Sequence, residues 1–265
     1  TLALLEAGAR VAAVEIDGRL AGRLRTTVEE RAAGAADRLT VVHQDAMTLT
    51  GPADVTGPGD GVASAAPTGG GPVQARGAAA AGEAARAGAP DRLVANLPYN
   101  VSVPVLLRVL ERFPSLASGV VMVQAEVGER LAASPGSKTY GAPSVKVAWY
   151  GVWRVRARIG RGVFWPVPNV DSVLVGFERT PPPDGRAAAG AQEGGRGLLR
   201  ERVFALVDAA FGQRRKMLRR TLAPLYGGAM AAARALTAAG IDPALRGERL
   251  TVGDFIRLAA GSEER

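Results

Sequence analysis

The sequence predicts an α/β protein built on a doubly wound, mostly parallel sheet, with a small all-helical domain after it. Short apolar stretches of strand character alternate with segments of helical spacing up to residue 150. This alternation is typical of a parallel sheet covered on both faces. Three further helical patterns follow residue 197 with no strand between them. A sheet domain followed by a helical domain accounts for both observations.

The expected elements follow in a regular order. Residues 1–7 look like the end of a helix capped by Gly8, and parallel strands are expected at residues 10–14, 39–43, 93–95 and 120–123. Helical spacing marks residues 20–31, 103–110 and 144–150. Two later strands, near residues 152–159 and 172–177, have no helix between them and so predict an antiparallel edge pair. Helices close the chain at residues 199–223, 228–239 and 251–260.

Two stretches interrupt this order. Residues 51–90 are dominated by Gly, Ala and Pro, and they predict a flexible insertion because such a composition has little apolar surface to bury. Residues 181–197 begin with three prolines and predict an interdomain linker. The predicted domains are therefore residues 1–180 and residues 198–265.

Composition excludes several classes of chemistry. The chain has no cysteine, which excludes disulfides, cysteine zinc sites and thiol catalysis. His43 is the only histidine, so a multi-histidine metal site is excluded and a serine–histidine relay is disfavoured. No apolar run approaches the ~20 residues that cross a bilayer, and no signal peptide is recognisable. We expect a soluble, cytoplasmic, monomeric protein without a metal site.

The positive charge is concentrated in the second half of the chain. Of the net charge of +8, residues 1–150 contribute nothing, with 14 basic and 14 acidic side chains, whereas residues 151–265 hold 19 basic and 11 acidic ones. This asymmetry favours a catalytic domain joined to a surface that binds nucleic acid. Compositional bias is the alternative, because Arg outnumbers Lys 30 to 3.

Polar residues follow the first three expected strands. These residues are Glu15, Asp45 and Asn96, and ligands of doubly wound sheets bind at the carboxyl ends of the strands. An acidic residue at the position of Glu15 commonly accepts hydrogen bonds from the ribose hydroxyls of an adenosine cofactor. Asp45 is suited to accept one from the adenine amine. Asp17 competes with Glu15 for this role but is more consistent with a cap of the next helix.

The segment Asn96-Leu97-Pro98-Tyr99 is an unusual end for a buried strand. A carboxamide lies beside a proline that cannot donate a backbone hydrogen bond, and an aromatic ring follows. This combination presents hydrogen-bond acceptors to an exocyclic amine of a base, with an aromatic face beside them for the base itself. The segment resembles the one with which amino-methyltransferases of the Asn/Asp-Pro-Pro/Leu-Pro-Tyr type hold a base, and this resemblance implies transfer of a methyl group to an adenine nitrogen.

Six segments resemble successive motifs of the ribosomal RNA adenine dimethyltransferase family. They are residues 14–17 (Val-Glu-Ile-Asp), 44–46 (Gln-Asp-Ala), 96–100 (Asn-Leu-Pro-Tyr-Asn), 164–172 (Phe-Trp-Pro-Val-Pro-Asn-Val-Asp-Ser), 211–218 (Phe-Gly-Gln-Arg-Arg-Lys-Met-Leu) and 250–255 (Leu-Thr-Val-Gly-Asp-Phe). The resemblance covers nearly the whole chain apart from residues 51–90 and 181–197. It implies a Rossmann-like methyltransferase sheet, S-adenosylmethionine as cofactor and a C-terminal RNA-binding domain.

The resemblance also implies how the cofactor is bound. Glu15 and Asp45, with the neighbouring Ile16 and Ala46, would hold the adenosine part of S-adenosylmethionine, and Asn96 would lie between the cofactor and the base.

The same resemblance implies roles in methyl transfer. A target adenosine would leave its stack and enter the site. The Asn96 carboxamide oxygen and the Leu97 backbone carbonyl, followed by Pro98, would accept hydrogen bonds from the N6 amine. Tyr99 would stack on one face of the base and Phe164 on the other. No general base is needed, so catalysis would come from positioning and electrostatics.

For two groups of side chains, a structural role is the alternative to a functional one. Five cations within seven residues favour phosphate contact and strong salt dependence, but they could also form a solvated helix end. Phe164 and Trp165 lie beside prolines, where aromatic rings often fill a core. The five cations are Arg214, Arg215, Lys216, Arg219 and Arg220.

The family's Gly-rich cofactor loop is not in place. In the family this loop ends in a Leu-Thr pair that opens the first helix, and Thr1 matches that Thr, so we expect the chain to begin just past the loop, to lack the N-terminal segment and to bind the cofactor poorly.

The motifs favour the housekeeping type of the family, which dimethylates two adjacent adenosines near the 3′ end of 16S rRNA in the small ribosomal subunit. One alternative is a large-subunit rRNA methyltransferase of the macrolide-resistance type. Another is a non-catalytic rRNA-binding assembly factor. A nicotinamide-dependent dehydrogenase is disfavoured, because it predicts a Gly-rich fingerprint that is absent.

Overall fold

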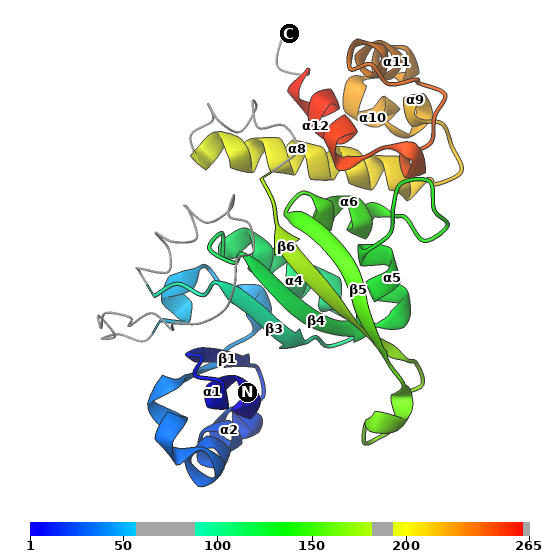
Figure 1. The fold of residues 1–265 in the computed structure, drawn as a ribbon. Helices are drawn as coiled ribbons and strands as arrows, with labels where there is room; N and C mark the ends of the chain where they lie inside the picture. The colour runs from blue at the N-terminus through cyan, green and yellow to red at the C-terminus, as the bar shows by residue number, and fades with distance from the viewer. Residues whose placement is uncertain (57–87, 182–192, 262–265) are drawn as a thin grey trace, which may run out of the picture. The chain divides into compact units, whose positions relative to one another are not determined.

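The computed structural model describes residues 1–56, 88–181 and 193–261, which form two compact units (Figure 1). The units are residues 1–119 and 120–265, and the boundary lies within strand β4 (Ser118–Gln124). Most of the predicted insertion and linker lies outside the described residues. This geometric division differs from the one that composition predicts near residues 181–197, and the predicted domains stay a prediction.

The first unit opens with two parallel strands and two helices. Helix α1 (Leu2–Glu6) leads to β1 (Val11–Glu15), and α2 (Gly18–Arg31) leads to β2 (Leu39–His43). The strands pair from Val11 opposite Leu39 to Glu15 opposite His43. The Asp17 carboxylate accepts hydrogen bonds from the backbone N–H groups of Arg19 and Leu20 at 2.8 and 3.2 Å, which confirms its role as a helix cap.

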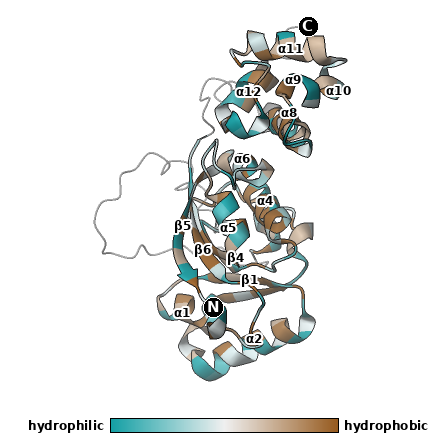
Figure 2. Cartoon of the chain, turned by 90° about the vertical axis from the view of Figure 1, so that its right-hand side faces the viewer, coloured by the Kyte–Doolittle hydropathy of each residue, from teal (hydrophilic) through white to brown (hydrophobic). Residues whose placement is uncertain are grey.

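The rest of the first unit carries the strand that ends in Asn96. Strand β3 (Arg92–Asn96) is followed by α4 (Ser102–Arg112), whose buried face includes Val105, Leu106 and Leu110. Figure 2 shows α4 largely in the hydrophobic colour. Three short 3-10 helices complete the unit: η1 (Ala33–Arg38), η2 (Ala46–Thr48) and η3 (Pro52–Asp54).

The strands form two sheets where we expected one. Strands β1 and β2 form a parallel pair, and the second sheet has the order β3-β4-β6-β5. Strands β5 (Gly151–Ile159) and β6 (Ser172–Arg179) pair antiparallel at its edge, as predicted, with a bulge between Val155 and Ala157. The mixed α/β class and the antiparallel pair are confirmed, but a single continuous sheet is not present in the described residues.

The second unit adds a helical part to these strands. Its helices are α5 (Ala125–Leu131), α6 (Ala142–Ala148), α8 (Glu193–Gly212), α9 (Leu218–Thr221), α10 (Ala223–Tyr226), α11 (Ala229–Ala238) and α12 (Val252–Ala260), and its short 3-10 helices are η4 (Arg161–Val163) and η5 (Gly247–Arg249).

The prediction of one helix over residues 199–223 is wrong at both ends. Helix α8 begins at Glu193, inside the predicted linker, and ends at Gly212. The backbone N–H of Leu218 donates to the Leu245 carbonyl at 2.8 Å, and that of Arg219 donates to the Pro243 carbonyl at 3.2 Å. These bonds to another segment replace helical ones, so residues 213–217 form a turn.

Aromatic contacts join α8 to α6 and the chain after it. The Phe204 ring packs edge-on against Trp149, with ring centroids 6.4 Å apart, and against Tyr150 at 6.5 Å. Lys146 on α6 forms an ion pair with Asp208 on α8 at 2.7 Å. The helical part therefore packs on α6 within the second unit, as Figure 1 also shows.

A buried tyrosine makes a second junction in this unit. The Tyr140 hydroxyl donates to the Leu250 carbonyl at 2.8 Å. Burial, and then the charge of Asp254, raise the pKa of Tyr140 well above its usual range, so this hydroxyl keeps its proton and acts as a donor.

The sequence did not predict helix α5. Its Gly128 explains both why the helix was not predicted and how the helix packs on β6. A glycine inside a helical pattern weakens the prediction of a helix. A Cβ on Gly128 would clash with Cγ2 of Val173 and lie 2.9 Å from Cγ2 of Val175, both on β6. Because only glycine fits there, α5 packs directly against the strand.

We expect Gly128→Ala to destabilise the second unit by about 1–3 kcal/mol, the usual range for overpacking a core. Urea unfolding monitored by tryptophan fluorescence would measure the change. Gly212→Ala is the control, because Gly212 is also helical and a Cβ on it would have no neighbouring atom within 4 Å. Equal stability of the two variants would contradict the proposed close approach.

Candidate active site

The turn after β3 exposes Asn96 and buries Leu97. Asn96 is exposed at the end of the strand, whereas Leu97 is only 8% exposed. The backbone N–H of Val101 donates to the Pro98 carbonyl at 3.3 Å, and the Ser102 hydroxyl donates to the Tyr99 carbonyl at 3.4 Å. The buried side chain and these two bonds hold the turn that leads into α4.

The acceptors of this turn are available to a ligand. Among the described residues, no hydrogen bond engages the Asn96 carboxamide or the Leu97 backbone carbonyl. Pro98 has no N–H that could compete. Tyr99 is half-buried beside them. The turn therefore offers a side-chain carbonyl and a backbone carbonyl next to an aromatic ring.

Glu15 and Asp45 lie at the same end of the β1–β2 pair. Glu15 lies opposite His43, and its backbone carbonyl accepts a hydrogen bond from the Gln44 N–H at 3.0 Å. Asp45 is the next residue along the chain and therefore lies close to Glu15. One Glu15 oxygen accepts from the backbone N–H of Asp17 at 2.9 Å.

Each of these carboxylates keeps one oxygen for a ligand. Oδ1 of Asp45 accepts from the backbone N–H of Met47 at 2.8 Å. The described residues provide no further hydrogen-bond donor to either side-chain carboxylate. Two oriented carboxylates at the carboxyl ends of paired strands fit the hydroxyl and amine donors of an adenosine.

The loop after Asp45 is fastened to the helix after Asn96. Helix α4 packs against η2, and the Arg108 guanidinium donates to the Leu49 carbonyl at 2.9 Å. Leu49 itself is 2% exposed. The sequence did not predict this contact of Arg108, because a single arginine on an amphipathic helix carries no signal of a tertiary contact. The first unit thus connects the acidic strand ends with the turn that carries Asn96.

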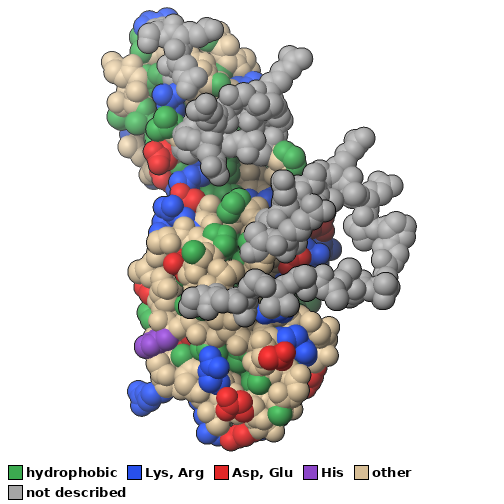
Figure 3. All heavy atoms as spheres, turned by 90° about the vertical axis from the view of Figure 1, so that its left-hand side faces the viewer, with side chains coloured by type: hydrophobic (Ala, Val, Ile, Leu, Met, Phe, Trp, Pro, Cys, Tyr) green, Lys and Arg blue, Asp and Glu red, His purple; other side chains and the backbone are tan. Residues whose placement is uncertain are grey.

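The single histidine occupies a structural position. Its ring Nε2 lies 3.1 Å from the Ile16 carbonyl, and a Cβ on Gly18 would lie 2.9 Å from its Cε1. Figure 3 shows this histidine at the surface. The described residues also contain no group of three His, Asp or Glu side chains that could hold a metal ion.

Phe164 belongs to the second unit, in the loop between β5 and β6. The Arg161 backbone N–H donates to the Asp171 carboxylate at 3.2 Å, and the Phe164 N–H donates to the Arg161 carbonyl at 3.2 Å. Phe164 is half-buried, and its stacking on a base stays a prediction. Trp165 is 94% exposed, so the core-filling alternative is wrong for that ring.

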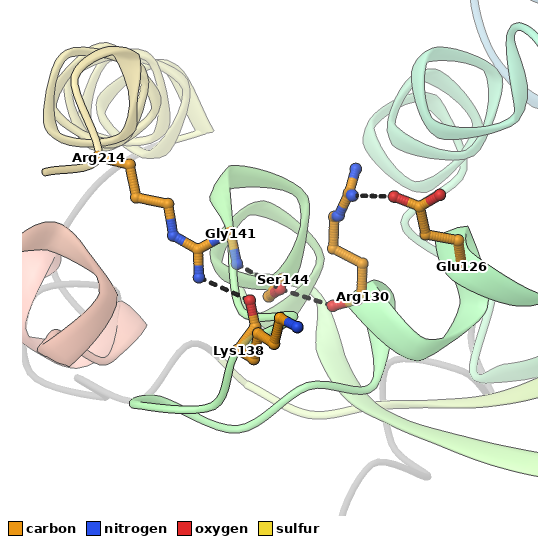
Figure 4. Close-up of polar contacts among 6 residues, drawn as sticks. All are labelled: Glu126, Arg130, Lys138, Gly141, Ser144 and Arg214. Carbon is orange, nitrogen blue, oxygen red and sulfur yellow. Dashed lines mark hydrogen bonds and ion pairs between the residues drawn. The ribbon is translucent and has the colours of Figure 1, made fainter.

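The five predicted RNA-binding cations fall into two groups. All five are exposed, in the turn after α8 and on α9. The Arg214 guanidinium forms an ion pair with Glu248 at 3.0 Å and donates to the Lys138 carbonyl at 2.6 Å. Figure 4 shows Arg214 reaching across to Lys138. Arg214 is therefore already engaged within the protein.

The other four cations make no side-chain hydrogen bond or ion pair with any described residue: Arg215, Lys216, Arg219 and Arg220. Their charges lie close together in the sequence, and an anionic partner would relieve their mutual repulsion.

The loop that receives Arg214 is itself well anchored. The Ser144 hydroxyl accepts from the Gly141 backbone N–H at 3.0 Å and donates to the Arg130 carbonyl at 2.5 Å, and the Arg130 guanidinium forms an ion pair with Glu126 at 2.6 Å (Figure 4). The Gly136 N–H also donates to the Glu248 carbonyl at 2.7 Å. The basic turn is thus tied to a fixed part of the second unit.

No helix among the described residues combines the length and the apolar character needed to cross a membrane.

Comparison with solved structures supports the fold. The chain is similar to a dimethyladenosine transferase from Plasmodium falciparum, with a TM-score of 0.61 and 18% identity, over 92% of this chain and 78% of that one. It is also similar to the 23S rRNA methyltransferase ErmE, with a TM-score of 0.53 and 19% identity, over 94% of this chain and 80% of that one. At this level of identity the likeness concerns the fold alone.

Sequence comparison finds relatives of much higher identity. A chain from Leifsonia xyli named ribosomal RNA small subunit methyltransferase A is 58% identical over 98% of this chain and 77% of its own length. Proteins of the same name from Streptomyces griseus and Bifidobacterium longum are each 48% identical, over 100% and 99% of this chain and 76% and 75% of their own lengths. The family model described as ribosomal RNA adenine dimethylase matches residues 1–262. The chain therefore belongs to the ribosomal RNA adenine dimethylase family.

Proposed function

We propose that this protein transfers methyl groups from S-adenosylmethionine to N6 of two adjacent adenosines near the 3′ end of 16S rRNA. The observation that carries the proposal is the exposed Asn96 carboxamide, which has no partner among the described residues and lies beside the Leu97 carbonyl. Family membership and the names of the relatives support the substrate.

The first unit would hold the adenosine part of the cofactor. The ligand-facing oxygens of Glu15 and Asp45 would accept hydrogen bonds from the ribose hydroxyls and the adenine amine, with Ile16 and Ala46 beside them. Their other oxygens are kept in place by the backbone N–H groups of Asp17 and Met47. When bound, S-adenosylmethionine supplies an electrophilic methyl group on a positively charged sulfur.

The turn after β3 would position the attacking nitrogen. The Asn96 carboxamide oxygen and the Leu97 carbonyl would accept the two N6 protons, which orients the lone pair of that nitrogen. Tyr99, and Phe164 from the second unit, would stack on the base. The proton that leaves N6 becomes acidic only during transfer and passes to solvent, so no imidazole is required. The structural contacts of His43 agree with this scheme.

Four exposed cations would bind the RNA backbone. Such contacts hold the substrate in register without selecting its sequence. Selection of the target would then depend on the base contacts of the turn after β3. Arg214 would contribute less, because Glu248 already balances its charge.

We expect Asn96→Ala to lower kcat/KM for methylation of small-subunit rRNA by about 100-fold or more, the scale for loss of one preorganised hydrogen bond in an active site. Binding of rRNA should be unchanged. Asn100→Ala is the matched control, since Asn100 is exposed in the same turn. Full methylation by Asn96→Ala would remove the proposed role, whereas loss of methylation with normal binding would support it.

Glu15→Gln should weaken S-adenosylmethionine binding about 10-fold or more, because hydrogen bonds to a charged acceptor are replaced by weaker ones. Calorimetry would measure the dissociation constant. Glu30→Gln, an exposed position on α2, removes the same charge and should have no effect. Equal effects of the two substitutions would indicate a general electrostatic cause and count against direct contact.

Replacing Arg219 and Arg220 by Gln should reduce the salt dependence of rRNA binding. Each lost phosphate contact lowers the slope of log K against log salt concentration by about 0.7–0.9. Arg214→Gln should change the slope less and lower thermal stability instead, since its partner Glu248 loses an ion pair. Titrations at several salt concentrations would separate these cases, and a larger slope change for Arg214→Gln would contradict the assignment.

A further inference from the structure

The loop between β5 and β6 carries the most exposed large apolar side chain among the described residues. Trp165 is 94% exposed, whereas Trp149 and Trp153 are 8% and 7% exposed. Three valines of the same loop are also exposed: Val163 at 72%, Val167 at 55% and Val170 at 41%. A tryptophan left in water loses the large apolar burial that normally stabilises this residue. Its exposure indicates a surface that a partner covers.

The loop holds its backbone in place before any partner binds. The Arg161 N–H donates to the Asp171 carboxylate, and the Asp171 carbonyl accepts from the Ala125 N–H at 2.9 Å. Pro166 and Pro168 restrict the backbone on the far side of Trp165. A ring presented by a restricted backbone loses little conformational freedom when it is covered.

Phe164 and Trp165 point to different environments. The Phe164 backbone is extended, with φ of −106° and ψ of 149°, and successive side chains in extended backbone point in opposite directions. Phe164 is accordingly half-buried while Trp165 is exposed. The two rings therefore lie on different sides of the loop.

The charges of this loop favour a nucleotide as the occupant. The Arg161 guanidinium contacts the Asn169 carbonyl at 3.4 Å, and no carboxylate among the described residues pairs with it. The acid of this loop, Asp171, accepts from the backbone of Arg161 instead. A loop that carries both an exposed aromatic ring and a cation without a carboxylate partner suits single-stranded nucleic acid, in which the ring stacks on a base and the cation attracts the phosphate.

We propose that Trp165 stacks on an unpaired nucleotide of the RNA substrate and thereby positions the RNA. Arg161, in the same loop, attracts the phosphate of that nucleotide. The inference rests on the proposed function, because a target segment of rRNA must leave its helix and so supplies unpaired bases. Trp165 is a positioning residue, and it does not contact the reacting atoms.

Tryptophan fluorescence tests this proposal directly. The probe is an RNA hairpin whose loop holds two adjacent adenosines, titrated into the protein without cofactor. Because Trp149 and Trp153 are buried, stacking should quench the exposed emission of Trp165, and the quenching should disappear in Trp165→Phe. Equal quenching in Trp165→Phe would overturn the proposal. This measurement does not depend on methylation, so it stays informative if the proposed reaction is wrong.

Steady-state kinetics provide the second readout. Trp165→Ala should raise KM for the rRNA substrate about 10-fold, the scale for one stacked base, with little change in kcat. Trp165→Phe should restore most of the loss, because a smaller ring still stacks. Val163→Ala in the same loop is the control and should leave both parameters unchanged. An unchanged KM for Trp165→Ala, or a loss that Phe does not restore, would overturn the proposal.

A second copy of the chain or a protein partner could also cover the ring, and the experiment separates these cases. Sedimentation of the native protein and of Trp165→Ala should give the same mass. If the substitution dissociates an oligomer or a protein complex while RNA binding is unchanged, the proposal fails.

Discussion

The candidate active site depends on the alternation of side-chain direction at the end of β3. Leu97 is buried in the core, so the preceding Asn96 faces solvent. Pro98 has no backbone N–H that could compete with a ligand for the acceptors of this turn. Leu49 is buried in the loop after Asp45, and its backbone carbonyl accepts a hydrogen bond from the guanidinium of Arg108 on α4. The acceptors are therefore held by the packing of their apolar neighbours, and the polar groups themselves stay unpaired for a ligand.

Local signals in the sequence were sufficient where neighbouring residues decide the structure. Strand β2 spans residues 39–43 as predicted, and Asp17 caps α2 through its own backbone neighbours. Prediction failed where distant contacts decide. Helix α5 was not predicted, and its Gly128 marks a close approach to β6. The break at residues 213–217 follows from bonds between Leu218 and Leu245, which lie far apart in the sequence.

The positions of the candidate site residues were more predictable than their surroundings, for the same reason. Glu15 and Asn96 end their strands and Asp45 lies two residues after β2, and the end of a strand is a local feature. By contrast, the exposure of Trp165 depends on where its loop lies, and its neighbour Phe164 carries the same aromatic signal in the sequence. The engagement of Arg214 by Glu248 joins residues that only the folded chain brings together.

Division of labour between the charged and the aromatic groups follows from their physics. Charge attraction acts over about 10 Å and is insensitive to sequence, so Arg215, Lys216, Arg219 and Arg220 can gather RNA but cannot choose an adenosine. Hydrogen bonds to N6 require an exocyclic amine at a fixed distance, and stacking requires a base that has left its helix. The single histidine is held at the Ile16 carbonyl, and the proposed scheme uses no general base. In that scheme recognition and catalysis would reside in the same small set of contacts around the base.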